Sequence, residues 1–195
     1  TRDFNILYIA DEVQSGMGRT GKMFASEHFD IVPDIITLAK GIASGLPLSA
    51  MVASEKIMNW LPGSHASTFG GNPVSCQTAL TTIRLLEDGL IDNAAKQGAY
   101  MINELKKLER TYPLIGDVRG LGLMLAVEIV KDKETKEYAP EVRDSIIQKA
   151  FSKGLLLLGC GRSAIRFCPP LILSKDDADA ALSIFEACLK VALQS

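Results

Sequence analysis

The sequence of 195 residues lacks the features that mark several large classes of protein. No apolar run approaches the roughly 18 residues that span a bilayer, and no signal-peptide pattern precedes the first apolar segment. Lysine and arginine (21) nearly balance aspartate and glutamate (23), without a basic stripe that could follow a phosphate backbone. We therefore expect a cytoplasmic protein that binds neither membranes nor nucleic acid.

The four cysteines have no pairing pattern. No C-x-x-C spacing occurs, and each cysteine stands among apolar neighbours, which is typical of a small core residue. Zinc binding and disulfide bonding are therefore not expected, in agreement with a reducing cytosol. Internal repeats, low-complexity tracts and heptads are also missing, whereas an apolar content of 47% is enough for a hydrophobic core. The cysteines are Cys76, Cys160, Cys168 and Cys188.

Two short apolar runs end in polar residues of opposite charge. Residues 6–10 (ILYIA) lead into Asp11, and residues 35–39 (IITLA) lead into Lys40. Continuous runs rich in β-formers are typical of strands buried on both faces, and the stretch between them is long enough for a parallel crossover. Asp11 and Lys40 are then expected at the same carboxyl edge of one sheet, where open α/β sheets bind ligands.

The rest of the chain predicts helices first and then an α+β unit. Residues 48–53 follow so short a link that we expect an antiparallel strand, and apolar positions at helical spacing predict helices over 73–90 and 91–108. A boundary between two domains is expected near residue 93. After Tyr112-Pro113 the patterns predict strands over 123–130, 155–158 and 164–167, and helices over 142–152 and 176–193, the last capped by Ser174.

The segment from Gly16 to Lys22 fits the phosphate-loop pattern G-x-x-x-x-G-K. The next residue is Met23, which has no hydroxyl to hold magnesium. The acidic strand also runs directly into the glycine loop, whereas these two parts stand on different strands in nucleotide hydrolases. Both departures argue against a nucleoside triphosphatase.

Asp11 and Lys40 together supply what a pyridine-ring cofactor requires. A lysine can form a Schiff base, and a carboxylate can keep the ring nitrogen protonated so that the ring takes up carbanion electrons. Taken singly, an aspartate after a strand is usually a turn or cap residue, and a lysine there is usually solvated. The expected position of Asp11 and Lys40 at one sheet edge favours a shared role in binding such a cofactor.

Four motifs in order resemble those of class III aminotransferases, and they span nearly the whole chain. The similarity is greatest to the branch that contains 4-aminobutyrate, ornithine and acetylornithine aminotransferases. It implies an α/β protein of fold type I (aspartate-aminotransferase-like). Residues 1–93 would be the C-terminal part of the cofactor-binding large domain with the interdomain helix, and residues 94–195 the small α+β C-terminal domain. The motifs are DEVQSGMGRTG (11–21), PDIITLAKG (33–41), STFGGNP (67–73) and IRFCPPL (165–171).

The resemblance also implies roles for the matched residues. Lys40 would carry pyridoxal 5'-phosphate as the internal aldimine and shuttle the proton, and Asp11 would pair with the pyridinium nitrogen. Val13 would pack on the ring face, and Gln14 would hydrogen-bond the phenolic oxygen. Thr68 would hold the cofactor phosphate of the neighbouring subunit, with Gly70-Gly71 letting the backbone approach closely, which implies a homodimer.

Arg166 would bind a substrate carboxylate, a task that suits the planar guanidinium fork. Its place between Ile165 and Phe167, ahead of two prolines, argues against a solvated strand arginine. No partner can be assigned to His28 or His65, for which structural roles are expected.

The implied activity is transfer of an amino group between an amino acid and a 2-oxo acid such as 2-oxoglutarate. Residues 39–50 (AKGIASGLPLSA) are most similar to 4-aminobutyrate-type members. Racemases, epimerases and a decarboxylase on the same scaffold are alternatives, as is a chain that serves only folding or dimerisation. The phosphate-cradling loop and the ring-stacking aromatic of the family's first half are not in this sequence, so we expect the isolated chain to be inactive.

Overall fold

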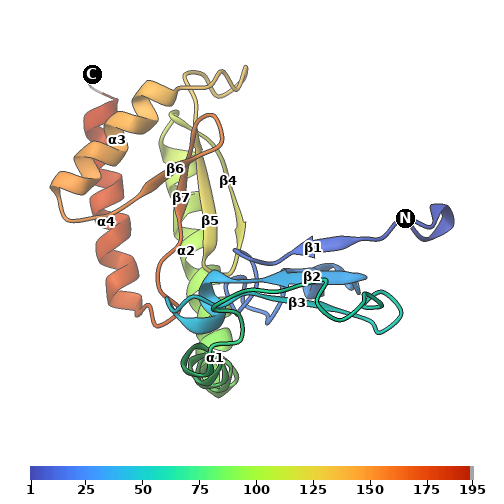
Figure 1. Cartoon of the computed structure of the whole chain (residues 1–195). Helices are drawn as coiled ribbons and strands as arrows, with labels where there is room; N and C mark the ends of the chain where they lie inside the picture. Colours follow the sequence, from blue (N-terminus) through green and yellow to red (C-terminus); the bar gives the residue numbers. More distant parts are fainter. Residues whose placement is uncertain (194–195) are drawn as a thin grey trace. The chain divides into compact units, whose positions relative to one another are not determined.

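The computed structural model describes residues 1–193, and of Arg2 only the backbone. Two compact units form, Thr1–Asp92 and Asn93–Ser195, and each is described by itself. Figure 1 shows the strands and helices of both. Within residues 1–193, no helix combines the length and the apolar character that crossing a membrane requires.

The first unit contains a three-stranded sheet in the order β1-β2-β3. Strands β1 (Ile9–Asp11) and β2 (Ile35–Leu38) are parallel, and β3 (Ala50–Ala53) runs antiparallel to β2. The predicted strands and their directions are confirmed, but the prediction that β1 is buried on both faces was wrong, because Ala10 is buried whereas Ile9 and Asp11 are exposed. Strand β1 begins three residues later than the apolar run, because its pairing with β2 starts only at Ile9. Just before this point, Tyr8 O accepts hydrogen bonds from the backbone N–H groups of Asp34 and Ile35, at 2.9 and 3.2 Å.

A helix supports the turn that follows β2. Helix α1 (Pro73–Leu85) begins after Asn72, whose Oδ1 accepts hydrogen bonds from the backbone of Val74 and Ser75 at 2.9 and 3.2 Å. It packs against the 3₁₀ turn Lys40–Ala43. A π-type turn, Leu86–Leu90, then interrupts the helical path, with Gly89 at a φ of 111°. The predicted helix over 73–90 is therefore confirmed with a break near its end.

The second unit is a four-stranded antiparallel sheet in the order β4-β5-β7-β6, with three helices packed on one of its faces (Figure 1). The predicted elements of this unit are confirmed, with β6 lying three residues later than predicted. Strand β4 was not predicted. The elements are α2 (Ile91–Thr111), β4 (Ile115–Leu121), β5 (Met124–Ile129), α3 (Pro140–Ser152), β6 (Leu158–Cys160), β7 (Ala164–Phe167) and α4 (Lys175–Ala192).

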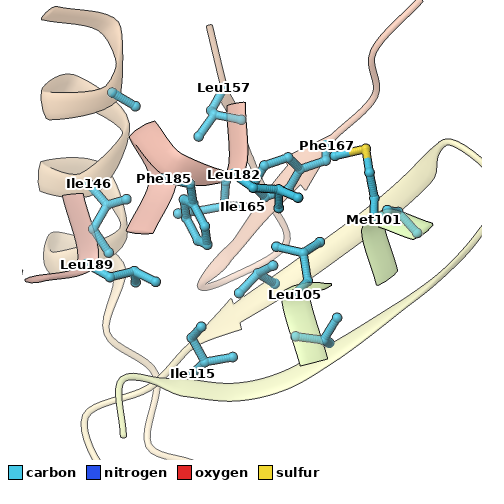
Figure 2. Packing of buried hydrophobic residues seen from close by; sticks show 14 of the residues in the cluster. Met101, Leu105, Ile115, Ile146, Leu157, Ile165, Phe167, Leu182, Phe185 and Leu189 are labelled. Carbon is cyan, nitrogen blue, oxygen red and sulfur yellow. The ribbon is translucent and has the colours of Figure 1, made fainter. Parts of the chain in front are cut away.

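The core of the second unit joins the helices to one face of the sheet (Figure 2). Leu125 and Val127 of β5 and Ile165 of β7 lie fully or almost fully buried in it. Phe185 of α4 meets Phe167 edge to face, with ring centroids 5.1 Å apart, and is itself fully buried. Removing so large a buried ring destabilises a fold by about 3–5 kcal/mol, so Phe185 is a main anchor of this unit.

The cysteines differ in burial. Cys188 is buried in the core and Cys76 and Cys160 are partly buried, but Cys168 is exposed. The prediction of a core position was wrong for Cys168. It directly follows Phe167, which faces the core, and alternation along an extended strand turns the next side chain to the opposite side. All four thiols are free.

Candidate active site

Asp11 ends β1 at the carboxyl edge of the parallel pair, where its carboxylate is held on one side. Oδ1 accepts hydrogen bonds from the backbone N–H of Val13 at 3.1 Å and from Thr37 Oγ1 at 3.3 Å. Thr37 stands opposite Asp11 in the register of β1 and β2. Because both of these bonds from the described residues fall on Oδ1, Oδ2 can accept a further donor.

Lys40 follows β2 at the same edge of the sheet, three residues after Thr37, and its side chain is exposed. Its φ of 45° lies in the left-handed region, which lysine adopts only at a cost of order 1 kcal/mol. Contacts with α1 and with the segment after Asp11 support this backbone. In the latter contact, a Cβ placed on Gly41 would lie 3.4 Å from Cβ of Met17.

Glu12 is a buried carboxylate that the sequence analysis did not single out. Oε1 accepts a hydrogen bond from the backbone N–H of Ser26 at 2.8 Å, and Oε2 accepts one from Ser15 Oγ at 2.5 Å. Burial raises the pKa of Glu12, but these hydrogen bonds and one from the Ala25 backbone outweigh burial, so its pKa lies below the ordinary range. Glu12 therefore stays ionised and fastens the loop that follows β1.

This glycine-rich loop is shaped for close backbone packing. A Cβ at Gly16 would lie 2.8 Å from Glu12 O, and Gly16 N donates to the same oxygen at 3.0 Å. The loop leads into a short 3₁₀ turn, Ala25–Phe29, whereas a phosphate loop leads into an α-helix. His28 of that turn has its Nε2 3.1 Å from both Thr20 O and Thr20 Oγ1, which supports a structural role.

The other cofactor residues predicted for the first unit lie in two places. Val13 and Gln14 follow Asp11 in the same turn and are partly buried. Thr68 lies in the exposed segment 61–71. Much of that segment, together with residues 47–49, lines an open hollow of 860 Å³. His65, which lines the hollow, stacks on Trp60 with the ring planes 8° apart, a contact that gives His65 a structural partner.

Arg166 lies in the middle of β7 in the second unit, opposite Ala126 of β5 and Leu158 of β6. Its Nε is buried without a hydrogen-bond partner among the described residues. An unpaired buried donor destabilises a fold by about 1–3 kcal/mol, so an acceptor placed beside Arg166 Nε would be stabilising. Arg166 and Cys168 border a hollow of 140 Å³.

These residues fit a pyridoxal-type cofactor. Asp11 and Lys40 come from neighbouring parallel strands at one sheet edge. Asp11 Oδ2 has no hydrogen-bond donor within the described part of the chain, and Lys40 is exposed. Within residues 1–193, no group of three or more histidine, cysteine or acidic side chains is arranged to hold a metal ion. A lysine and a carboxylate placed in this way are what an enzyme requires in order to hold pyridoxal phosphate by its aldehyde carbon and its ring nitrogen.

The family model for class III aminotransferases matches residues 1–189. The chain therefore belongs to the class III aminotransferase family, whose members are pyridoxal-phosphate enzymes. The resemblance seen in the four motifs is confirmed.

Curated relatives carry three different activities in their names. A leucine/methionine racemase of Thermococcus litoralis is 45% identical over 94% of this chain and 42% of its own length. A 4-aminobutyrate aminotransferase of Mycobacterium leprae is 45% identical over 96% and 43%, and an acetylornithine aminotransferase of Caldanaerobacter subterraneus subsp. tengcongensis is 39% identical over 93% and 44%. The chain spans less than half the length of these relatives.

A solved structure confirms the fold. The structure of a Bacillus anthracis aminotransferase matches with a TM-score of 0.92 at 34% identity, over 97% of this chain and 46% of that one. Fold type I is therefore shown for this chain, which mixes helices with two sheets as predicted.

Proposed function

We propose that this chain carries the cofactor lysine and the ring-nitrogen carboxylate of an aminotransferase that moves an amino group between an amino acid and a 2-oxo acid. The observation that carries this proposal is the pairing of β1 with β2. It brings Asp11, with its orientation fixed by Thr37, to the sheet edge where Lys40 begins its turn. When bound, pyridoxal phosphate supplies an electron sink for the carbanion.

The chain's own residues would divide the remaining work. Asp11 Oδ2 would accept the ring N–H and keep that nitrogen protonated through a charge-assisted hydrogen bond. Lys40 Nζ would attach the cofactor and then move the proton at the carbon that bears the amino group. Val13 would pack on the ring and Gln14 would bond its phenolic oxygen. Arg166 would bind a substrate carboxylate, and its Nε, which has no partner among the described residues, supports that role.

We further propose that Thr68 serves the cofactor phosphate of a second copy, so that the active form is a homodimer. The exposed segment 61–71 supports this, because Phe69 is 73% exposed beside the 860 Å³ hollow and large exposed apolar side chains at a rimmed hollow are typical of interfaces. Residues 1–93 would belong to the large domain with the interdomain helix, and residues 94–195 would form the small one. The cytoplasmic location stays a prediction.

The amino donor is proposed to be an ω-amino acid such as 4-aminobutyrate, with 2-oxoglutarate as acceptor. Residues 39–50 and the Mycobacterium leprae relative support it. A racemase is the second candidate, because the Thermococcus litoralis relative has the same 45% identity. Asp11 and Lys40 would do the same electronic work in both, and only the fate of the carbanion differs.

Single enantiomers decide between the two reactions. The full-length protein is incubated with one enantiomer of an amino acid, with and without 2-oxoglutarate. An aminotransferase converts the substrate only when the oxo acid is present, whereas inversion without the oxo acid overturns the proposal in favour of a racemase. The 195 residues alone are expected to give no turnover, because they span less than half of the relatives. Rates like those of a full-length relative would contradict that expectation.

A further inference from the structure

Two arginines of the second unit lie in one row across the sheet. Ala126 of β5 stands opposite Arg119 of β4 on one side and opposite Arg166 of β7 on the other. Residues that are opposite in antiparallel strands project from the same face of the sheet. The neighbours Leu125, Val127 and Ile165 point into the core, so both arginines project from the other face, with only a methyl side chain between their strands.

The same face carries one carboxylate within reach of both arginines. Glu128 lies two residues after Ala126 on β5, opposite Asp117 of β4. It is therefore a diagonal neighbour of Arg119 and of Arg166, at a separation of about 7–8 Å that long side chains can bridge. The sheet register thus offers Glu128 two possible cationic partners.

Glu128 pairs with only one of them. Arg119 Nη2 lies 2.7 Å from Glu128 Oε2, and Arg119 Nη1 lies 2.8 Å from Asp117 Oδ2. The guanidinium is thereby fixed at two of its nitrogens. Arg166 forms no ion pair with any residue of the described chain, and its buried Nε has no partner.

The burial of Glu128 makes this choice of partner consequential. Its side chain is only 16% exposed, against 52% for Arg119. A mostly buried carboxylate that loses its cation is strongly destabilised and takes the nearest alternative. Arg143 is also near enough to Glu128 to feel its charge, but it already bonds Asp144 and the backbone oxygen of Arg162. Arg166 is therefore the nearby arginine that has no ion-pair partner among the described residues.

We propose that Arg119 is a positioning residue that holds Glu128 and so keeps Arg166 free for the carboxylate of the substrate. The inference rests on the proposed function, in which Arg166 binds that carboxylate. Without Arg119, Glu128 becomes an internal competitor of the substrate. The effect is expected on substrate binding, because this proposal gives Arg119 a role only through Glu128 and Arg166.

The test is a set of variants of the full-length protein. Arg119→Gln should raise the KM for 2-oxoglutarate roughly tenfold and weaken binding of glutarate, an unreactive dicarboxylate, by the same factor in calorimetry, the scale of one charge-assisted bond. The kcat should stay within about threefold. The double variant Arg119→Gln/Glu128→Gln should return both values to near wild type, because the competitor is gone. If Arg119 had only a structural role, the double variant would not recover. A double variant that keeps the raised KM and the weakened glutarate binding therefore overturns the proposal.

Two controls separate this inference from the function on which it rests. Asp117→Asn removes the other partner of Arg119 but leaves Glu128 held, so the KM should change less than about twofold. Arg166→Gln tests the carboxylate site itself. If it leaves the KM unchanged, the assignment of Arg166 fails. If Arg166→Gln raises the KM and Arg119→Gln does not, only the positioning role fails. Should Arg119→Gln not fold, Arg119→Met, which keeps the aliphatic stem, replaces it in the same comparison.

Discussion

Thr37 Oγ1 donates a hydrogen bond to Asp11 Oδ1 at 3.3 Å across the parallel strands β1 and β2. This bond fixes the carboxylate that is proposed to face the cofactor ring. Thr37→Val keeps the shape and removes the hydroxyl, so the affinity of the full-length protein for pyridoxal phosphate should fall roughly three- to tenfold, the scale of about 1 kcal/mol. Absorbance titration measures it. Thr37→Ser is the control that keeps the donor, and equal affinities for the valine and serine variants would contradict this role.

Asp11→Asn tests the charge of the same carboxylate. The amide keeps most of the shape but cannot hold the ring nitrogen protonated, so we expect the transamination rate to fall roughly 100-fold or more, as when a preorganised charge is lost. Following the cofactor spectrum after mixing with an amino acid measures the chemical step directly. A rate within a few-fold of wild type would show that the electronic argument is mistaken.

Lys40 should be the single lysine that is labelled when the loaded full-length protein is reduced with borohydride and mapped by peptide mass. Its exposed amino group stands at the sheet edge beside Asp11. Lys22 is an internal control, because its Nζ bonds the backbone oxygen of Glu27 at 2.9 Å. A label on Lys22, or on any other lysine in place of Lys40, excludes the assignment.

Glu12 makes stability depend on pH. Because its pKa lies below the ordinary value of about 4.3, its contribution is fully present above that value and is lost as the pH falls through the lowered pKa. Glu12→Gln should reduce the free energy of unfolding by about 1–3 kcal/mol at pH 7, and the difference should shrink below about pH 4. Denaturant unfolding measures both. The exposed Glu55→Gln is the control, and a difference that does not vary with pH would argue against an ionised Glu12.

Gly98 should be sensitive to a single added methyl group. In a helix interior, glycine to alanine normally stabilises by about 0.5–1 kcal/mol. In α2, however, a Cβ on Gly98 would lie 2.2 Å from Gly122 O, so Gly98→Ala should destabilise the second unit by about 1–3 kcal/mol. Thermal unfolding shows whether Gly98→Ala raises or lowers the stability. Asn103→Ala, on an exposed position of the same helix, should leave stability unchanged or slightly higher.

The parts of the fold that could be predicted are those that local pattern determines. The continuous apolar runs before Asp11 and Lys40 predicted a parallel pair of strands, and that pair forms. The expected burial on both faces was wrong for β1, in which Ile9 is 55% exposed. Ser174 could be recognised as a helix cap, and it forms a capping box with Asp177. Strand β4 was missed because a register shift between Ile115 and Asp117 breaks its alternation.

The parts that could not be predicted depend on contacts between distant residues. Glu12 reads as an exposed acid after a strand, and its burial depends on Ser26, fourteen residues away. The pairing of Arg119 with Glu128 follows from the register of β4 and β5, which composition does not determine. The roles of Val13, Gln14, Thr68 and Arg166 were implied by resemblance and stay predictions.

The backbone of Lys40 decides which inactive variant can serve as a fair reference. Its φ of 45° suits glycine, and asparagine next best. Lys40→Ala removes the amine but keeps the unfavourable backbone, whereas Lys40→Asn removes the amine and relaxes it. The asparagine variant should therefore have a higher melting temperature than the alanine variant, although both are inactive. A melting temperature taken from either variant alone would misjudge how much the bound cofactor stabilises the active protein. Both have to be measured before any gain in stability is assigned to the cofactor.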